Sequence, residues 1–208
     1  MQQKDSGFSG DHLYYGKMHD AVFLGIDPAS TSGWAILLPP KMRLYASGVA
    51  DNAKERMAVF EKAKDIAEDM ELPLIVGAEK WTPGGWKSFN SMMGVGSSWG
   101  KWSEVLEIGG HKKKNIFRVE PNEWRRRLLG ARPGRHKRDE LKAMALRNVH
   151  GRGWPHVTDD NEAEAILIAI YFALKTDLLL LRKKATPTHA IPLGSGLQRR
   201  PHRFVFGS

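Results

Sequence analysis

A short apolar segment near the start of the chain ends abruptly at an acidic residue, and this junction constrains the fold more than any other feature. Residues 21–26 read Ala-Val-Phe-Leu-Gly-Ile, a run whose β-branched and aromatic members predict a strand buried on both faces. Asp27 follows, and after it come a turn of Pro-Ala-Ser-Thr-Ser-Gly and a second apolar run over residues 33–38. Two apolar runs joined by such a turn predict a hairpin.

The carboxylate of Asp27 requires a partner at this position, because burying an unpaired charge is costly. This segment alone leaves two explanations open. Asp27 caps the turn through its own backbone, as aspartate often does, or it is held by a cation or another hydrogen-bonded group.

The rest of the chain alternates between strand and helix patterns. Strands are expected at 43–49, 72–79 and 116–119, and helices at 52–70, 88–106, 121–129 and 137–149, with a long helix opening at 158. The 72–79 strand follows a helix directly, so it should lie parallel to the first strand. This order is that of the ribonuclease H-like fold, an α/β architecture with a five-stranded mixed sheet flanked by helices.

Four acids are expected to meet in this fold: Asp27, Glu79, Asp160 and Glu164. The ends of the first and fourth strands lie side by side, and residues 160 and 164 share one helix face. Carboxylates this close repel and raise each other's pKa unless divalent metal lies between them. Hard oxygen ligands suit Mg²⁺ or Mn²⁺, and two ions roughly 3.5–4 Å apart would clamp the attacking water and leaving oxygen of a phosphodiester.

The acids that open the final helix have a second explanation. Residue 158 or Asp159 suits the N-cap, and first-turn acids complement the helix dipole. We favour this explanation for Asp159 and Glu162. It fits Glu164 less well, because Glu164 lies deeper in the helix between two alanines, where small neighbours leave room for metal and backbone.

Composition excludes several classes of protein. The chain has no cysteine, so disulfides, thiolate zinc sites and cysteine nucleophiles are excluded. No apolar run approaches the ~18 residues that span a bilayer, so we expect no membrane partner. The 32 Lys and Arg against 23 Asp and Glu give a net charge of +9, the sign expected of a protein that binds polyanions.

At 208 residues the chain suits one domain with appendages. We expect a loose arm over residues 1–20, the main domain over 21–182, and a flexible basic tail over 183–208. The acids within the first 20 residues argue against a transit peptide. We therefore expect a cytoplasmic, nucleoid-associated protein of a bacterial or phage-infected cell rather than an organellar one.

Five segments resemble the motifs of RuvC-type Holliday junction resolvases, in the same order along residues 21–175. They are Gly25-Ile-Asp-Pro-Ala-Ser-Thr-Ser-Gly-Trp-Ala35, Ala78-Glu-Lys80, Ser91-Met-Met-Gly-Val-Gly-Ser-Ser-Trp-Gly100, Glu120-Pro-Asn-Glu-Trp-Arg-Arg-Arg-Leu-Leu129 and Asp160-Asn-Glu-Ala-Glu-Ala-Ile-Leu-Ile-Ala169. The fourth and fifth are most similar to the phage and chloroplast branch. Two positions depart from the bacterial pattern: Glu164 stands where aspartate is usual, and Asn161 where a third acid is. Which of Asp159, Asp160 and Asn161 completes the site stays open, and we predict Asp160.

The resemblance implies a homodimeric, Mg²⁺-dependent endodeoxyribonuclease of DNA recombination and repair. It would nick opposing strands of a four-way DNA junction and leave 5′-phosphate ends, with Asp27, Glu79, Asp160 and Glu164 as catalytic metal ligands. Protein twofold symmetry would match the symmetry of the substrate. Gly96 and Gly100 are candidates for the subunit contact, or they permit close packing of their helix on the sheet within one subunit.

A basic stretch predicts the DNA-binding surface. Eleven Lys and Arg but only two acids lie between residues 111 and 138, which favours phosphate binding over a merely solvated face. The expected DNA-binding residues are Lys80, Trp81, Trp86, Lys87, Lys112, Lys113, Lys114, Arg125, Arg126, Arg127, Arg132, Arg135, Lys137 and Arg138. Trp81 and Trp86 would stack on opened bases unless they belong to the core, and Lys80 or Lys87 would stabilise charge on the scissile phosphate.

Other functions share parts of this pattern. A phosphotransferase of the actin and sugar-kinase type also opens with Gly-Ile-Asp, but it needs two copies of the fold, for which 208 residues are too few. A non-catalytic junction-binding protein would have no need to retain four mutually repelling acids. A nuclease acting on RNA–DNA hybrids or other branched DNA is the nearest alternative, and charge and acids alone do not distinguish it.

Overall fold

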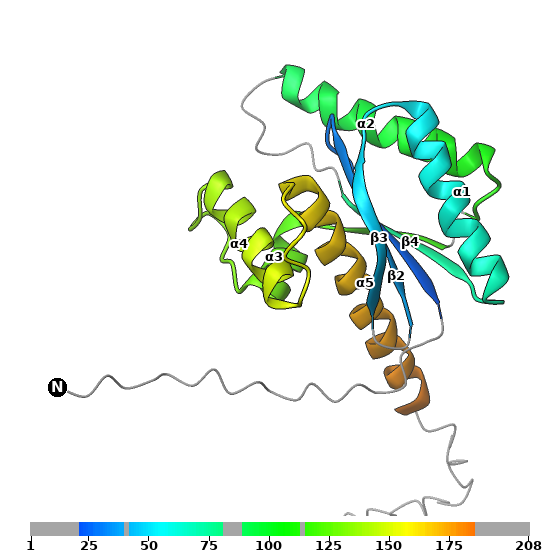
Figure 1. Ribbon diagram of the computed structural model, residues 1–208. Coiled ribbons are helices and arrows are strands. Elements are labelled where there is room, and N and C mark those ends of the chain that lie inside the picture. The colour runs from blue at the N-terminus through cyan, green and yellow to red at the C-terminus, as the bar shows by residue number, and fades with distance from the viewer. Residues whose placement is uncertain (1–20, 40–41, 81–88, 113–114, 186–208) are drawn as a thin grey trace, which may run out of the picture.

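The computed structural model describes residues 21–39, 42–80, 89–112 and 115–185 of the chain (Figure 1). These residues form one sheet with helices on both faces. In chain order the elements are β1 (Val22–Asp27), β2 (Ser32–Leu38), β3 (Arg43–Ala50), α1 (Ala53–Asp69), β4 (Leu74–Glu79), α2 (Phe89–Ile108), β5 (Ile116–Val119), α3 (Pro121–Leu129), α4 (Arg138–Gly151) and α5 (Asp160–Ala185). Each expected strand and helix is present, with ends shifted by a few residues.

The five strands are ordered β3-β2-β1-β4-β5. The β1–β2 and β2–β3 pairs are antiparallel, while β4 lies parallel to both β1 and β5. The predicted mixed five-stranded sheet flanked by helices is therefore confirmed. Because β1 and β4 run the same way side by side, Asp27 and Glu79 end these strands at the same edge of the sheet.

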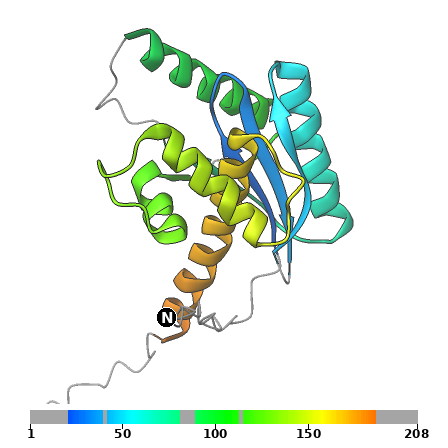
Figure 2. The same cartoon turned by 60° about the vertical axis from the view of Figure 1, so that its left-hand side comes forward.

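The alternation of side chains along β1 separates two hydrophobic cores. Val22, Leu24 and Ile26 pack with residues of α1 and α2 on one face, and Phe23 packs with residues of α5 on the other. Figures 1 and 2 show α1 and α2 together on one side of the sheet and α5 on the opposite side. Asp27 has the same strand parity as Phe23, so its side chain points to the α5 face.

Helix α5 lies unusually close to the sheet because two neighbouring strands carry glycine beneath it. Gly25 of β1 and Gly77 of β4 are register partners. A Cβ at Gly25 would lie 2.3 Å from the carbonyl oxygen of Ala165, and one at Gly77 would lie 2.0 Å from the ring of Phe172. At Gly25 the facing residues of α5 are also small, Ala165 and Ala169. Gly33 of β2 lies beneath Asn161 in the first turn of α5.

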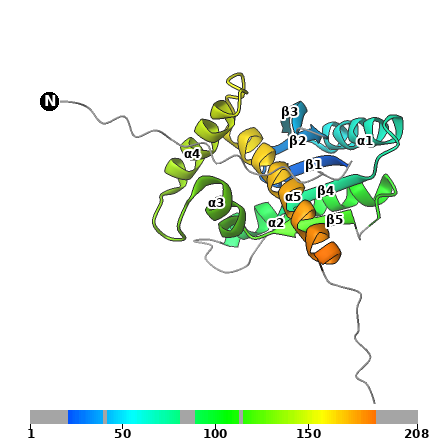
Figure 3. The same ribbon diagram turned by 90° about the horizontal axis from the view of Figure 1, so that it is seen from below.

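Helices α3 and α4 cover the side of α5 that faces away from the sheet, as Figure 3 shows from below. Trp124 of α3 is fully buried in the same core as Ala145 and Val149 of α4. Although α5 has 26 residues, neither it nor any other helix in the described part of the chain is long and apolar enough to cross a membrane.

Candidate metal centre

Three acids that are distant in the sequence converge at the edge of the sheet. Asp27 ends β1, Glu79 ends β4, and Glu164 lies one turn into α5. Each offers one carboxylate oxygen, and these oxygens all lie within 4.8 Å of one another. The parallel pairing of β1 with β4 brings the first two together, and the close approach of α5 adds the third.

The turn after β1 does not account for Asp27. Within the described turn Asp27 takes part through its backbone carbonyl, which accepts a hydrogen bond from Ala29 N (2.9 Å). The hydroxyl of Ser32 donates to the carbonyl of Ala29 and closes the turn. The Asp27 carboxylate instead lies beside those of Glu79 and Glu164, and among the described residues it makes no hydrogen bond to the turn. That a cation holds this acid remains a prediction.

Burial and the charges of neighbouring acids both disfavour the charged forms of Asp27 and Glu79. Asp27 is 8 % exposed and Glu164 is 7 % exposed. Burial raises the pKa of Asp27 well above its ordinary value, and the charges of Glu164 and Glu79 raise it further. Burial likewise raises the pKa of Glu79 to about 7, against a lowering by Arg125. A divalent cation would offset the repulsion between these carboxylates. The three carboxylate oxygens therefore fit a hard metal ion such as Mg²⁺ or Mn²⁺.

Two neighbouring side chains of α3 hold the acids in place. The indole Nε1 of Trp124 donates a hydrogen bond to Glu79 Oε2 (2.9 Å). The guanidinium of Arg125 forms ion pairs with Glu79 Oε2 (3.3 Å) and Glu164 Oε2 (2.9 Å). Sequence reasoning missed Trp124 and placed Arg125 among the phosphate-binding residues. Two signals were available: both residues lie in the 120–129 segment that carries the resemblance, and this helix follows β5, the strand paired with β4.

The comparison with solved structures matches this architecture. No protein-family model matches the chain, and the search of curated proteins gives no match. Thermus thermophilus RuvC in complex with a Holliday junction substrate is similar at a TM-score of 0.51 and 17 % identity, covering 76 % of this chain and 96 % of that one. This chain has the RuvC fold.

Two further structures are similar at lower scores. A second Thermus thermophilus RuvC structure has a TM-score of 0.49 and 20 % identity, with the same coverage of 76 % and 96 %. The yeast mitochondrial Holliday junction resolvase Ydc2 has a TM-score of 0.44 and 10 % identity, covering 79 % of this chain and 83 % of that one.

In this RuvC fold, the three acids Asp159, Asp160 and Glu162 at the start of α5 each make different contacts. Asp159 Oδ1 accepts hydrogen bonds from the backbone N–H groups of Asn161 (2.8 Å) and Glu162 (3.0 Å), which is the N-cap arrangement predicted for it. Glu162 accepts a hydrogen bond from Ser47 of β3 (2.6 Å). Asp160 forms an ion pair with Lys142 of α4 and does not belong to the group of three converging acids. Its role as a metal ligand remains a prediction.

Substitution separates the cap from the candidate ligand. We expect Asp159→Ala to lower the free energy of unfolding by about 1 kcal/mol through loss of the cap, with a small effect on cleavage. We expect Asp160→Asn to leave stability nearly unchanged and to reduce cleavage at least ~10-fold, because Asp160 is near enough to raise the pKa of Asp27. Urea unfolding and single-turnover cleavage measure the two effects. Full activity of Asp160→Asn would remove Asp160 from the site.

A buried arginine supports the turn next to Asp27 from the other face of the sheet. Arg56 of α1 is 1 % exposed. One nitrogen of its guanidinium lies 3.3–3.5 Å from the backbone carbonyls of Ser30, Ala50 and Asp51. These contacts tie the turn after β1 to the junction of β3 and α1. Sequence reasoning missed Arg56, since a lone charge in an amphipathic helix is normally exposed.

Most of the basic residues predicted to bind DNA that the structure describes are exposed, and they lie on α3, on α4 or between these helices. Arg126, Arg127, Arg132, Arg135, Lys137 and Arg138 are exposed, as is Lys112. Lys80, which follows Glu79 in the chain, forms a half-exposed ion pair with Glu120 (2.8 Å). Trp81, Trp86, Lys87, Lys113 and Lys114 lie outside the described residues. The DNA-binding role of all these residues remains a prediction.

The raised pKa of Glu79 sets a pH dependence for the metal-free protein. Glu79 has a pKa of about 7 in the folded state against an ordinary value of 4.5, so the folded protein binds more protons than the unfolded chain across that window. The stabilisation that protonated Glu79 gives to the folded protein is therefore lost as pH rises from 4.5 through 7. This loss lowers the free energy of unfolding by about 1–3 kcal/mol. We expect urea unfolding in EDTA at pH 5 and pH 7.5 to show this loss relative to Glu79→Gln. An equal pH dependence of the two proteins would contradict it.

Proposed function

We propose that this protein is a Holliday junction resolvase, a Mg²⁺-dependent endonuclease that nicks opposing strands of four-way DNA junctions and leaves 5′-phosphate ends. The convergence of Asp27, Glu79 and Glu164 beside a basic helical layer, within a RuvC fold, is the observation that carries this proposal. We expect the protein to act on the DNA of a bacterial or phage-infected cell, in the cytoplasm.

The three acids would hold the metal, with Asp160 as a fourth ligand after release from Lys142. When bound, two divalent ions would activate the attacking water and stabilise the leaving oxygen of the phosphodiester. The chain's own residues supply the rest of the site. Trp124 orients the Glu79 carboxylate, and the α5 backbone over Gly25 fixes the depth at which Glu164 lies.

The exposed basic residues of α3, α4 and their connection would bind the phosphates of the junction arms. Such contacts give affinity and orientation but little sequence information. The layer formed by α3 and α4 lies next to the acids, because Arg125 of α3 contacts two of them and Lys142 of α4 contacts Asp160. DNA bound on this layer would pass close to the metal centre.

A substrate panel tests the proposal. The protein is incubated in Mg²⁺ with a mobile four-way junction, a plain duplex, a splayed branch and an RNA–DNA hybrid of matched length. We expect paired, symmetric nicks in the junction, with products that DNA ligase seals, and at least ~100-fold slower cleavage of the plain duplex. Preference for the hybrid would make the protein a different ribonuclease H-like nuclease, and junction binding without any cleavage would leave a non-catalytic binding protein.

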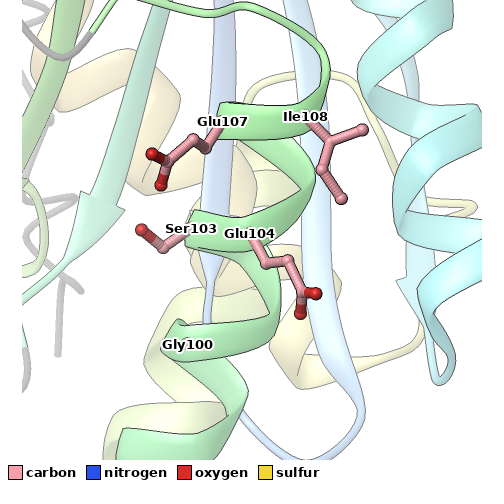
Figure 4. Close-up of a pocket in the computed structure, with 5 residues that line it drawn as sticks. All are labelled: Gly100, Ser103, Glu104, Glu107 and Ile108. Carbon is pink, nitrogen blue, oxygen red and sulfur yellow. The ribbon is translucent and has the colours of Figure 1, made fainter.

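The proposed homodimer has a candidate contact on α2. The inner face of α2 buries Trp102, Val105 and Leu106, and its opposite face is open. No described atom lies within 4 Å of a Cβ placed on Gly96 or Gly100, so these glycines do not pack against their own sheet. A shallow hollow of about 380 Å³ borders the same helix (Figure 4), lined by Gly100, Ser103, Glu104, Glu107 and Ile108. This open face would receive α2 of a second subunit.

A bulky charge on this face is expected to separate the subunits. Gly100→Arg should convert a dimer into a monomer in light scattering at micromolar concentration, with the helix content unchanged. The matched control is Gly151→Arg at the end of α4, where a Cβ also meets no described atom. A Gly100→Arg protein that stays dimeric would place the subunit contact elsewhere.

A further inference from the structure

Arg125 contacts two of the three converging acids, and the geometry of these contacts differs from that of an ordinary arginine–carboxylate pair. One nitrogen of its guanidinium, Nη2, makes both contacts, to Glu79 Oε2 and to Glu164 Oε2. Its Nε is buried and has no hydrogen-bond partner among the described residues. A stable arginine–carboxylate pair is normally bidentate, with two parallel N–H to oxygen bonds. Arg125 therefore places a positive charge beside the two acids but does not form a bidentate pair with either of them.

The backbone of α3 directs Arg125 to this position. Pro121 opens the helix directly after β5, and the fully buried Trp124 fixes the rotation of α3 against the core. The guanidinium of Arg125 lies 4.9 Å from the ring centre of Trp124. The Arg125 side chain is 19 % exposed, and the next two residues, Arg126 and Arg127, are exposed on the same helix.

The charges of the cluster are unbalanced. Asp27, Glu79 and Glu164 carry three negative charges when ionised, and Arg125 is the one described cation that contacts any of them. Lys142 repeats the arrangement at Asp160. Both cations come from the α3–α4 layer, and each is paired with an acid that the proposed function assigns to metal. A divalent ion and Arg125 would compete for the same oxygen atoms.

We propose that Arg125 is an internal counter-ion that a divalent metal ion displaces, and that the released guanidinium then binds a phosphate of the DNA. In the metal-free protein it reduces the repulsion among the acids. In the metal-bound protein the released side chain joins the basic surface of α3. The second half of this inference rests on the proposed function, while the first half concerns metal alone.

Metal binding to the full chain tests the competition without DNA. Mn²⁺ is titrated into the wild type, Arg125→Gln and Arg127→Gln, and free Mn²⁺ is followed by electron paramagnetic resonance. Arg127→Gln is the matched control, with the same charge change at an exposed position of the same helix. We expect Arg125→Gln to lower the Kd for Mn²⁺ at least ~10-fold and the control to change it less than ~2-fold. An unchanged or higher Kd in Arg125→Gln would overturn the proposal.

A second measurement observes the wild type and uses the conservative variant Arg125→Lys only to assign the signal. The Arg125 Nε–H group is followed by ¹⁵N NMR and assigned by its absence from Arg125→Lys. We expect Mg²⁺ to shift this signal and to speed its exchange with water, because the released side chain leaves its buried position. A signal that Mg²⁺ does not move would overturn the displacement.

Junction binding tests the transfer to phosphate. The slope of log Kd against log salt is measured in EDTA and in Ca²⁺, for the wild type and Arg125→Gln. We expect equal slopes in EDTA and a slope larger by about 1 for the wild type in Ca²⁺. Equal slopes in Ca²⁺ would refute the transfer. A wild type that binds no Mn²⁺ at all would instead refute the metal centre and with it the proposed function.

Discussion

Asp27→Asn is expected to reduce strand cleavage at least ~10³-fold while leaving junction affinity unchanged or tighter. Asp27 lies at the end of β1 beside Glu79 and Glu164, and it is buried, so it is not one of the exposed basic residues expected to bind DNA phosphates. The substitution keeps the size of the side chain but removes a negative charge from the candidate metal centre. Single-turnover cleavage of a labelled junction and gel-shift titration in EDTA measure the two effects separately.

The same substitution is expected to stabilise the metal-free protein at pH 8. Burial and the charges of Glu164 and Glu79 hold the pKa of Asp27 well above its ordinary value, so ionised Asp27 opposes folding at this pH. A neutral amide removes that cost, and the melting temperature in EDTA should rise. Asp65→Asn is the control, since Asp65 is exposed on α1. Normal Mg²⁺-dependent cleavage by Asp27→Asn would refute its role as a metal ligand.

Gly33→Ala is expected to reduce cleavage without changing any of the acids, because the added methyl group displaces α5, the helix that carries Glu164. Gly33 of β2 is the register partner of Asp27. A Cβ at this position would lie 1.9 Å from the carbonyl oxygen of Asn161 and 2.8 Å from the nitrogen of Glu162, so the first turn of α5 must shift. We expect a loss of about 1–3 kcal/mol in the free energy of unfolding and at least ~100-fold in cleavage.

The control for Gly33→Ala is Gly151→Ala, where no described atom lies within 4 Å of the added Cβ. Gly151 ends α4, so alanine there should be neutral or stabilise the helix by up to about 1 kcal/mol. Urea unfolding and Mn²⁺ affinity follow both variants. A Gly33→Ala protein with wild-type stability and cleavage would mean that α5 tolerates a wider separation from β2.

Local pattern was sufficient to predict the strands, the helices and the three converging acids, although it also predicted Asp160 as a fourth. The apolar run before Asp27 and the one before Glu79 are short and bounded by acids, and a helix separates them, so parallel pairing brings their ends together. Glu164 followed from its depth in the helix between alanines. The N-cap role of Asp159 followed from ordinary first-turn chemistry and is confirmed by its two backbone contacts.

Other features depend on which side chains meet across elements, and a single sequence carries little information on that. The stretch Trp124-Arg-Arg-Arg127 looks uniformly basic after its tryptophan, yet only the packing of α3 turns Arg125 toward two acids and leaves Arg126 and Arg127 exposed. The pairing of Asp160 with Lys142 is a contact between two helices. The open face at Gly96 and Gly100 is equally a property of the folded chain.

The sequence by itself thus determined the fold class and the acids, because buried strands, their order and the residues that end them follow from local hydrophobic pattern and chain connectivity. Only the tertiary structure decided which cation neutralises those acids. That choice depends on the rotation of α3 about its own axis, which the packing of Trp124 sets and which no periodicity in the sequence records.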